Sequence, residues 1–393
     1  MKKKIFYLFI LLTINNYSQN KGLNIGYTKS KNYFEEFHFD FIKNKIIVPV
    51  EIEGVTYKFI LDTGAPNIIS EELNKVINPK PLQIIPVTDA NGKRNKLSVV
   101  SVKTLKFGNI IFKNTATLVY NLNTNPILKC FGIDGFIGSN MLRHSIIQID
   151  AEQQKIILTD NRKKLNLNKK NSVKIKLIDP QSSPYLWIAL KGTNHAKEHV
   201  LIDTGMDGIY DIALKNYTLL KKEKIFTPIG ESKGASGISL FGDVPLKKHL
   251  KLHLPTLKIN GLEIKNSITH TTNDDNSRIG AKILKYGIIT IDFKNKRFYL
   301  NPKHKTINIK APPLNFSKTI KNGKLIIGFV WDTKLKEKIS YGDEILEING
   351  KKIVLCDLIT NAFFYDKSGP ITLKIKPKKG AVFELIINKK TQD

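Results

Sequence analysis

Short apolar stretches recur along residues 40–160, and turn-forming Gly, Asn and Pro separate them. Residues 45–50, 57–61 and 146–150 are examples, in which Ile, Val, Phe and Leu predominate. Stretches of this length and composition are typical of β-strands. A polar, basic segment follows at residues 160–171, and the same strand-like pattern then returns. The pattern therefore predicts a mainly β protein in which a second half resembles the first.

Three landmarks of the first half recur, in the same order, in the second half. Each half has an apolar strand that ends in Asp-Thr-Gly, then an apolar residue followed by Gly, then an Ile-x-Ile-Asp sequence. From the first aspartate, the glycine is 76 residues away in the first half and 77 in the second, and the final aspartate is 88 and 89 residues away. Such constant spacing predicts an internal duplication, whereas a lone Asp-Thr-Gly would be a weak signal. The landmark residues are Asp62, Gly138 and Asp150 in the first half, and Asp203, Gly280 and Asp292 in the second.

Asp62 and Asp203 each follow an apolar strand, where an unpaired carboxylate is costly to remove from water. Gly64 and Gly205 let the backbone turn sharply, and their N–H groups can approach the carboxylate because no Cβ is in the way. If the two halves pack about a pseudo-two-fold axis, the two turns meet. Two adjacent carboxyl groups share one proton, so that one activates a water and the other donates to a developing oxyanion.

The duplicated motif resembles the aspartic peptidases, in particular the retropepsin-like and pepsin-like families, over residues 40–304. In these families each lobe supplies one apolar-apolar-Asp-Thr/Ser-Gly turn, and a later apolar-apolar-Gly segment braces it. Residues 60–64 with residues 136–138, and residues 201–205 with residues 279–280, match both elements. The resemblance implies two β-barrel lobes, with a polypeptide substrate bound in the cleft between them.

The resemblance also assigns roles to residues of the two turns. Asp62 and Asp203 are implied to be the catalytic pair, which acts without a metal ion or a covalent intermediate. The threonines are implied to interlock across the interface between the lobes. The supporting residues of the pair are Thr63, Gly64, Thr204 and Gly205.

Two features depart from the pattern of these families. The residue after the Gly is usually small, as Ala65 is, but Met206 follows the second Gly. The flap hairpin of pepsin-like members carries a tyrosine, which the candidate hairpin at residues 87–100, with its turn at residues 91–92, does not have. A retropepsin-like flap fits this hairpin better. The glycine-rich residues 230–242 fit a matching second flap and a plain surface loop equally well.

A further domain is expected near the C-terminus, after a Pro- and Lys-rich linker at residues 302–313. Residues 342–350 read Gly-Asp-Glu-Ile-Leu-Glu-Ile-Asn-Gly and resemble a strand and turn of PDZ domains. The resemblance implies capture of a peptide C-terminus by strand addition. The carboxylate-binding loop of that family is not evident, so a structural module packed on the peptidase is the alternative. Strands are expected at residues 325–331, 371–375 and 382–387, and a helix at residues 357–365.

The first twenty residues are interpreted as a signal peptide, because three lysines precede an apolar stretch at residues 5–14. This stretch of about ten residues is too short to span a bilayer. We therefore expect an exported protein, in the periplasm, at the cell surface or secreted, with no stable membrane insertion. The cleavage site, and whether residues 21–40 form a pro-segment, stay open.

Charge and cysteine content exclude several other classes. The chain has 63 Lys and Arg against 34 Asp and Glu, but the lysines are scattered and form no basic run interleaved with aromatic residues. We therefore expect no nucleic-acid partner. Cys130 and Cys356 fall in different predicted domains, so both are expected to be free and buried. Two Cys and eight His give no cluster at zinc-ligand spacing, so neither a metal nor a cofactor is expected.

Together these inferences predict an exported aspartic endopeptidase with bilobal, pepsin- or retropepsin-like β-barrel lobes and a small PDZ-like α/β domain. One alternative is a catalytically silent protein that uses the same fold to bind peptides. Another is hydrolysis of a non-peptide amide of the cell envelope. Substrate preference, working pH and oligomeric state are not predicted. The expected parts are a signal peptide at residues 1–20, lobes at residues 21–162 and 173–304, and the PDZ-like domain at residues 314–393.

Overall fold

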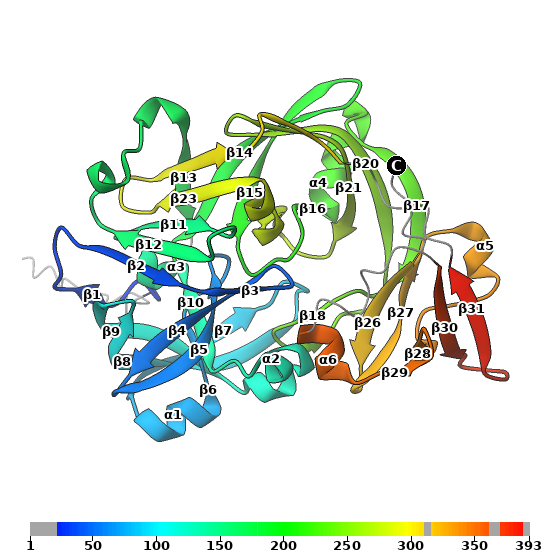
Figure 1. The fold of residues 1–393 in the computed structure, drawn as a ribbon, viewed down its shortest axis with the longest axis horizontal. Coiled ribbons are helices and arrows are strands. Elements are labelled where there is room, and N and C mark those ends of the chain that lie inside the picture. The colour runs from blue at the N-terminus through cyan, green and yellow to red at the C-terminus, as the bar shows by residue number, and fades with distance from the viewer. Residues whose placement is uncertain (1–21, 179, 310–315, 361–369, 388–393) are drawn as a thin grey trace, which may run out of the picture.

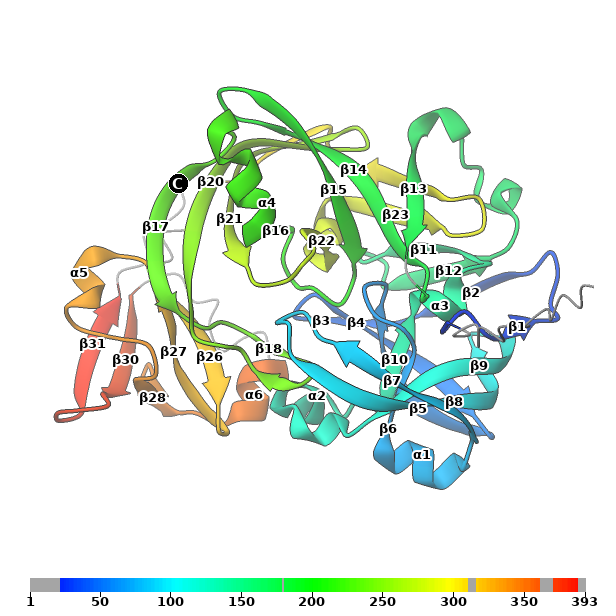
Figure 2. The same ribbon diagram turned by 180° about the vertical axis from the view of Figure 1, so that it is seen from behind.

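The structure is a computed structural model and describes residues 22–178, 180–309, 316–360 and 370–387. The predicted signal peptide lies outside the described residues. Strands dominate the chain, and they form two large lobes with a smaller domain beside the second lobe (Figures 1 and 2). The prediction of a mainly β protein is confirmed.

The first lobe is built around a sheet in the order β1-β9-β6-β10-β5-β4-β8-β7, with β3 paired to β4. Its apolar strands β4 and β5 carry inward-facing residues such as Val48, Val50 and Phe59 into the core. The elements of this lobe are β1 (Tyr27–Thr28), β2 (Phe34–His38), β3 (Asp40–Ile42), β4 (Lys45–Ile52), β5 (Val55–Asp62), β6 (Ile68–Ser70), α1 (Glu71–Ile77), β7 (Lys80–Thr88), β8 (Arg94–Phe107), β9 (Ile110–Tyr120), η1 (Leu122–Thr124), α2 (Pro126–Phe131), β10 (Gly135–Gly138), α3 (Ser139–Leu142), β11 (Ile146–Asp150) and β12 (Lys155–Thr159).

The second lobe follows a short helical connection and repeats the central pairings of the first. In the first lobe β10 runs parallel to β5 and antiparallel to β6, and in the second lobe β22 relates in the same way to β15 and β16. The elements are η2 (Arg162–Leu165), η3 (Lys169–Asn171), β13 (Ser172–Ile178), β14 (Ser183–Lys191), β15 (His195–Asp203), β16 (Tyr210–Ala213), α4 (Leu214–Leu220), η4 (Lys221–Glu223), β17 (Thr227–Gly234), β18 (Ile238–Ser239), β19 (Gly242–Asp243), β20 (Lys247–Ile259), β21 (Leu262–Thr272), β22 (Arg278–Gly280), η5 (Ala281–Tyr286), β23 (Gly287–Asp292), β24 (Arg297–Pro302) and β25 (Thr306–Asn308).

A shared sheet joins the two lobes. The strands that end in the repeated Ile-x-Ile-Asp sequence, β11 and β23, pair antiparallel, with Ile147 opposite Ile291. Each strand of the pair is flanked on its outer side by strands of its own lobe, so the sheet has the order β2-β12-β11-β23-β24-β13. Residues of both lobes belong to one continuous apolar core. The lobes are therefore fixed to each other by backbone hydrogen bonds and by apolar packing.

The C-terminal domain is a small sheet in the order β26-β27-β28-β30-β31, with β29 paired to β28 and a core of its own. The expected strands are present, and the helix α6 ends at Thr360, beyond which part of its predicted range lies outside the described residues. The elements are β26 (Phe316–Lys321), β27 (Lys324–Val330), α5 (Thr333–Lys336), β28 (Glu344–Ile348), β29 (Lys351–Lys352), α6 (Leu355–Thr360), β30 (Ile371–Lys376) and β31 (Phe383–Ile387).

The predicted linker contains a strand. Residues 306–308 form β25, which runs parallel to β21 of the second lobe, with Ile307 opposite Ile264. Proline and lysine content indicated a free segment, but Thr306 and Ile307 are strand formers, and they add to an available sheet edge. The reading of this stretch as a linker is therefore wrong for residues 306–308.

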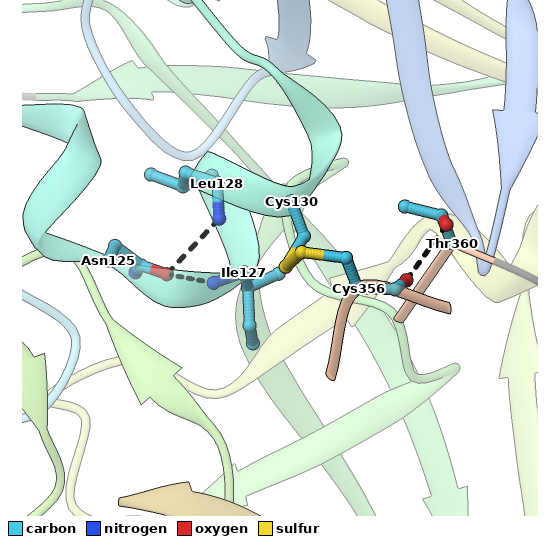
Figure 3. The surroundings of a disulfide bond; sticks show 6 residues. All are labelled: Asn125, Ile127, Leu128, Cys130, Cys356 and Thr360. Carbon is cyan, nitrogen blue, oxygen red and sulfur yellow. Dashed lines mark hydrogen bonds between the residues drawn. A yellow bond between two sulfur atoms is a disulfide. The ribbon is translucent and has the colours of Figure 1, made fainter. Parts of the chain in front are cut away.

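The expectation that both cysteines are free and buried is wrong, since they are bonded to each other, Cys356 is exposed and Cys130 is half-buried. Cys130 of α2 and Cys356 of α6 form a disulfide, with their Cα atoms 4.9 Å apart (Figure 3). The two short helices lie side by side although 226 residues separate the cysteines, because the C-terminal domain folds back onto the first lobe. Distance along the sequence and assignment to different domains carried no information on this contact.

Candidate active site

The two Asp-Thr-Gly turns lie at corresponding strand ends in the two lobes. Asp62 ends β5 opposite Gly138 of β10, and Asp203 ends β15 opposite Gly280 of β22. The glycines of the bracing strands, Gly138 and Gly280, allow the backbone of each turn to approach closely. A Cβ on Gly138 would lie 2.2 Å from the carbonyl carbon of Pro66. Each bracing strand therefore packs directly against the turn that carries the aspartate.

The threonines of the two turns join the lobes by reciprocal hydrogen bonds. The Thr63 N–H donates to Thr204 Oγ1 at 3.0 Å, and the Thr204 N–H donates to Thr63 Oγ1 at 3.2 Å. Each hydroxyl then donates to a carbonyl of the opposite lobe, Thr63 to Ile202 at 2.6 Å and Thr204 to Leu61 at 2.8 Å. Both side chains are buried, so these bonds are shielded from water.

Each carboxyl group lies against the glycine of the opposite turn. A Cβ on Gly64 would lie 2.6 Å from Cγ of Asp203, and a Cβ on Gly205 would lie 2.3 Å from Oδ2 of Asp62. The Gly64 and Gly205 N–H groups each donate to the aspartate of their own turn at 2.9 Å. The absence of side chains at these two glycines thus brings the carboxyl groups of Asp62 and Asp203 together.

The two carboxyl groups lie close enough for the charge of Asp203 to act directly on Asp62. Burial raises the pKa of Asp62 to about 7, and the nearby negative charge of Asp203 adds to this rise. Hydrogen bonding from Gly64 and the positive charge of Lys45 act in the opposite direction. Below neutral pH the pair therefore holds a proton that ordinary aspartates would have released.

Further polar residues surround the turns. Lys45, the first residue of β4, donates through Nζ to the carbonyl oxygen of Gly205. Gln181 donates to the carbonyl oxygen of Gly64 at 3.1 Å. Arg278, the first residue of β22, has Nη1 3.4 Å from Oδ2 of Asp203. The sequence pattern did not single out these three side chains.

A cavity of about 530 Å³ opens above the dyad. Its walls combine apolar side chains from both lobes with many polar side chains, which include the two aspartates. Apolar lining residues include Ile60, Val87, Leu118, Phe136, Tyr185, Leu201 and Leu240. Polar lining residues include Asp62, Asp203, Asp274 and Arg278.

Two hairpins meet over this cavity. The β7–β8 hairpin turns at residues 89–93, where Gly92 has φ +78° as the predicted turn requires. The long β17–β20 hairpin of the second lobe ends in the small β18–β19 hairpin, so the glycine-rich stretch is not a plain loop. Oδ2 of Asp89 accepts hydrogen bonds from Ser239 Oγ at 2.5 Å and from the Phe241 N–H at 3.2 Å. The tips of the two hairpins are therefore tied to each other.

The C-terminal domain packs on the outside of the second hairpin. The Val330 N–H donates to Ser232 Oγ at 3.0 Å, and Thr319 Oγ1 donates to the Gly237 carbonyl at 3.1 Å. In both views β27 lies next to β17 (Figures 1 and 2). Asn125 precedes α2 and caps it by accepting hydrogen bonds from the Ile127 and Leu128 N–H groups (Figure 3). Its side-chain amide also donates to the Ser239 carbonyl at 3.0 Å. The disulfide-linked helices thus lie beside the hairpin tip that covers the dyad.

The described residues contain no group of three His, Cys, Asp or Glu side chains that could hold a metal ion. In the same ranges, no helix has the length and apolar character needed to cross a bilayer. The expectation of no cofactor stays a prediction.

Comparison with known proteins agrees with the class that the motif indicates. Residues 48–141 match the family model described as aspartyl protease. Among solved structures, an aspartic proteinase from Irpex lacteus is 12% identical, with a TM-score of 0.42 over 69% of this chain and 97% of that chain. No curated protein matches the chain. The matched residues contain the Asp62 turn and its bracing strand, so this part of the chain is similar to aspartyl proteases.

Proposed function

We propose that the chain is an exported aspartic endopeptidase, in which Asp62 and Asp203 activate a water for attack on a peptide bond. The observation that carries this proposal is the pair of adjacent carboxyl groups, each packed against the glycine of the other turn, in the lining of one cavity. Two buried threonines fix the pair from opposite lobes. The similarity of residues 48–141 to aspartyl proteases supports the same class.

The geometry supports general acid–base chemistry without a covalent intermediate. One carboxyl group is charged and accepts a proton from the water, whose oxygen attacks the carbonyl carbon of the peptide bond. The other carboxyl group is neutral and donates its proton to the carbonyl oxygen as negative charge develops there. The tied hairpins above the dyad limit access of bulk water, and an extended peptide in the cavity would lie beneath them.

Export is proposed on two independent observations. The first twenty residues have the charge and apolar pattern of a signal peptide. The Cys130–Cys356 disulfide joins two parts of the chain, and disulfides of this kind persist in oxidising compartments such as the periplasm or the cell surface.

The C-terminal domain is proposed to be PDZ-like. The Gly-Asp-x-Ile-Leu-x-Ile-Asn-Gly sequence begins in the turn before β28 and ends in the turn before β29. Peptide capture by this domain stays a hypothesis. Its packing against the second-lobe hairpin favours a structural contribution.

The test uses Asp62→Asn and Asp203→Asn in the mature chain. Each substitution keeps the size of the side chain and removes the ionisable group, so we expect loss of cleavage by a factor of at least 10³. Incubation with a proteome digest, followed by sequencing of new termini, measures activity and specificity together. Asp40→Asn, in which an exposed carboxyl group outside the cavity lining is replaced, serves as the matched control and should retain activity.

Circular dichroism and thermal unfolding of each variant separate loss of activity from loss of fold. Retained cleavage in both dyad variants would contradict the proposal. A folded wild-type chain that cleaves nothing but binds peptides would support a silent peptide-binding protein. Release of new amines from envelope polymers, without cleavage of peptides, would indicate hydrolysis of a non-peptide amide.

A further inference from the structure

The two carboxyl groups of the dyad differ in the number of hydrogen-bond donors and cations that contact them. Asp203 accepts hydrogen bonds on Oδ1 from the N–H groups of Gly205 at 2.9 Å and Met206 at 3.1 Å. Its Oδ2 faces Arg278 Nη1 at 3.4 Å. Within the described ranges, Asp62 accepts one backbone hydrogen bond, from Gly64. Donors and a cation favour the charged form of a carboxyl group, so the surroundings favour the charge on Asp203.

The guanidinium of Arg278 is held in place from its other side. Nε lies 3.2 Å from both carboxylate oxygens of Asp211 on β16, and Nη2 donates to Oδ2 of the same residue. This two-pronged contact leaves Nη1 directed at Asp203 and at Asp274, whose Oδ2 is 3.3 Å away. The planar guanidinium group can contact Asp211 and Asp203 at the same time, whereas a lysine ammonium cannot make both contacts in this geometry.

The first lobe carries a different residue at this place. Arg278 pairs with Leu201, two residues before Asp203, and the corresponding residue of β10 is Phe136, which pairs with Ile60, two residues before Asp62. Phe136 lines the cavity as Arg278 does, but it carries no charge. The unequal surroundings of the two aspartates thus result from a difference in sequence between the two bracing strands.

We propose that Arg278 is a positioning residue that holds the negative charge of the dyad on Asp203 and leaves the shared proton on Asp62. This assignment rests on the proposed peptidase function. Asp203 accepts the proton of the attacking water, and the water oxygen forms a bond to the carbonyl carbon. The carbonyl π-electron pair moves to its oxygen, which receives the proton of Asp62. No charge has to move between the carboxyl groups before the attack.

Other charged groups around the pair act in part against the effect of Arg278. Lys45 acts on Asp62 by its charge, yet its ammonium is bound to the Gly205 carbonyl and not to a carboxylate. Asp211 and Asp274 partly offset the charge of Arg278.

The test measures kcat/KM against pH for the wild type, Arg278→Gln and Arg278→Lys. Below the acid limb of the profile, both carboxyl groups of the dyad are protonated and activity is lost. Without the cation the singly charged pair is less stable, so Arg278→Gln should move the acid limb to higher pH by about one unit. Arg278→Lys keeps the charge and should restore part of this shift. An unchanged acid limb in Arg278→Gln would overturn the proposal.

Arg297→Gln is the matched control, because Arg297 of β24 lies outside the residues that line the cavity and its guanidinium donates to Ser172. Its replacement removes one positive charge from the chain and should leave the acid limb in place. A shift in Arg297→Gln as large as that in Arg278→Gln would mean that the limb reports the net charge of the chain and not the cation beside Asp203, and would overturn the proposal.

A second measurement is independent of turnover and separates this proposal from the peptidase function. Carboxyl ¹³C resonances, assigned with Asp62→Asn and Asp203→Asn, report which aspartate carries the proton. We expect a charged Asp203 and a protonated Asp62 at pH 5 in the wild type, and a more even distribution in Arg278→Gln. A protonated Asp203 in the wild type would overturn the proposal even if the chain is an active peptidase. The expected pattern in a chain that cleaves nothing would support the charge assignment and contradict the peptidase.

Discussion

Thr63 and Thr204 connect the local sequence of each turn to the placement of the dyad. Each threonine gives its N–H and its hydroxyl to the opposite lobe, so the turns cannot move independently. A buried hydrogen-bonding group that loses its partner costs about 1–3 kcal/mol. These four hydrogen bonds therefore stabilise the fold and also fix the distance between the two carboxyl groups.

Thr63→Ala should lower the free energy of unfolding by about 2 kcal/mol, because the Thr204 N–H and the Ile202 carbonyl lose a buried partner. The rate of cleavage should fall as well, since the turn that carries Asp62 is no longer fixed to the other lobe. Urea unfolding and kcat measure the two effects. Thr63→Ser keeps the hydroxyl and should restore most of both. A Thr63→Ala variant as stable as the wild type would argue against this role.

The residues of the two turns could be predicted because the signal is local and occurs twice. An Asp-Thr-Gly after an apolar strand constrains the backbone, and its repetition at constant spacing places both copies on equivalent strands. Arg278 was overlooked, although it directly precedes the bracing Ile279-Gly280. A buried cation at this place needs carboxylate partners, and these come from β15, β16 and residue 274, which only the folded chain brings together.

At the level of elements, the hairpins above the dyad are longer than the sequence indicated. The Asn-Gly turn was found from its residues, whereas β7 begins at Lys80, well before the predicted range. Alternation of apolar and polar residues marks a strand but not the sheet that it joins. The contact between Asp89 and the β18–β19 hairpin depends on two distant segments, and no local pattern predicts it.

Ser239→Ala should raise KM about tenfold with little change in kcat. The Ser239 hydroxyl donates to the Asp89 carboxylate, and loss of one such charge-assisted hydrogen bond costs about 1.4 kcal/mol. Substrate binding must then supply this free energy to bring the hairpins together. Steady-state kinetics with one peptide substrate provides the measurement. Ser98→Ala, on an exposed face of β8 in the same hairpin system, is the control and should leave KM unchanged. An effect on kcat alone would contradict a closing role for this contact.

At the scale of the whole molecule, the C-terminal domain is fastened at two places. Its β26 and β27 contact the second-lobe hairpin, and the disulfide joins its α6 to α2 of the first lobe. The Pro- and Lys-rich segment and the PDZ-like sequence at residues 342–350 predict a separate domain here, but its docking is a long-range contact. The pairing of Cys130 with Cys356 follows from that docking, so a sequence-based estimate had no means to find it.

Reduction of the disulfide, or its replacement by Ser at both positions, should lower the free energy of unfolding by about 2–4 kcal/mol, since the crosslink closes a long loop in the unfolded chain. Thermal unfolding with and without reductant measures this effect. The double variant should no longer respond to reductant, which makes it the internal control. Equal melting temperatures of the oxidised and reduced wild type would show that the crosslink contributes no stability.

Because β11 and β23 join the two lobes in one sheet, both aspartates of the pair come from the same molecule. A pair built from two identical copies would carry the same neighbours on each side, so an arginine beside one aspartate would stand beside the other as well. Two cations would then face a single shared negative charge, and nothing would distinguish acid from base. With two unlike turns on one chain, we expect cleavage per molecule to be independent of dilution, and the proposed direction of proton transfer to be set before a substrate binds.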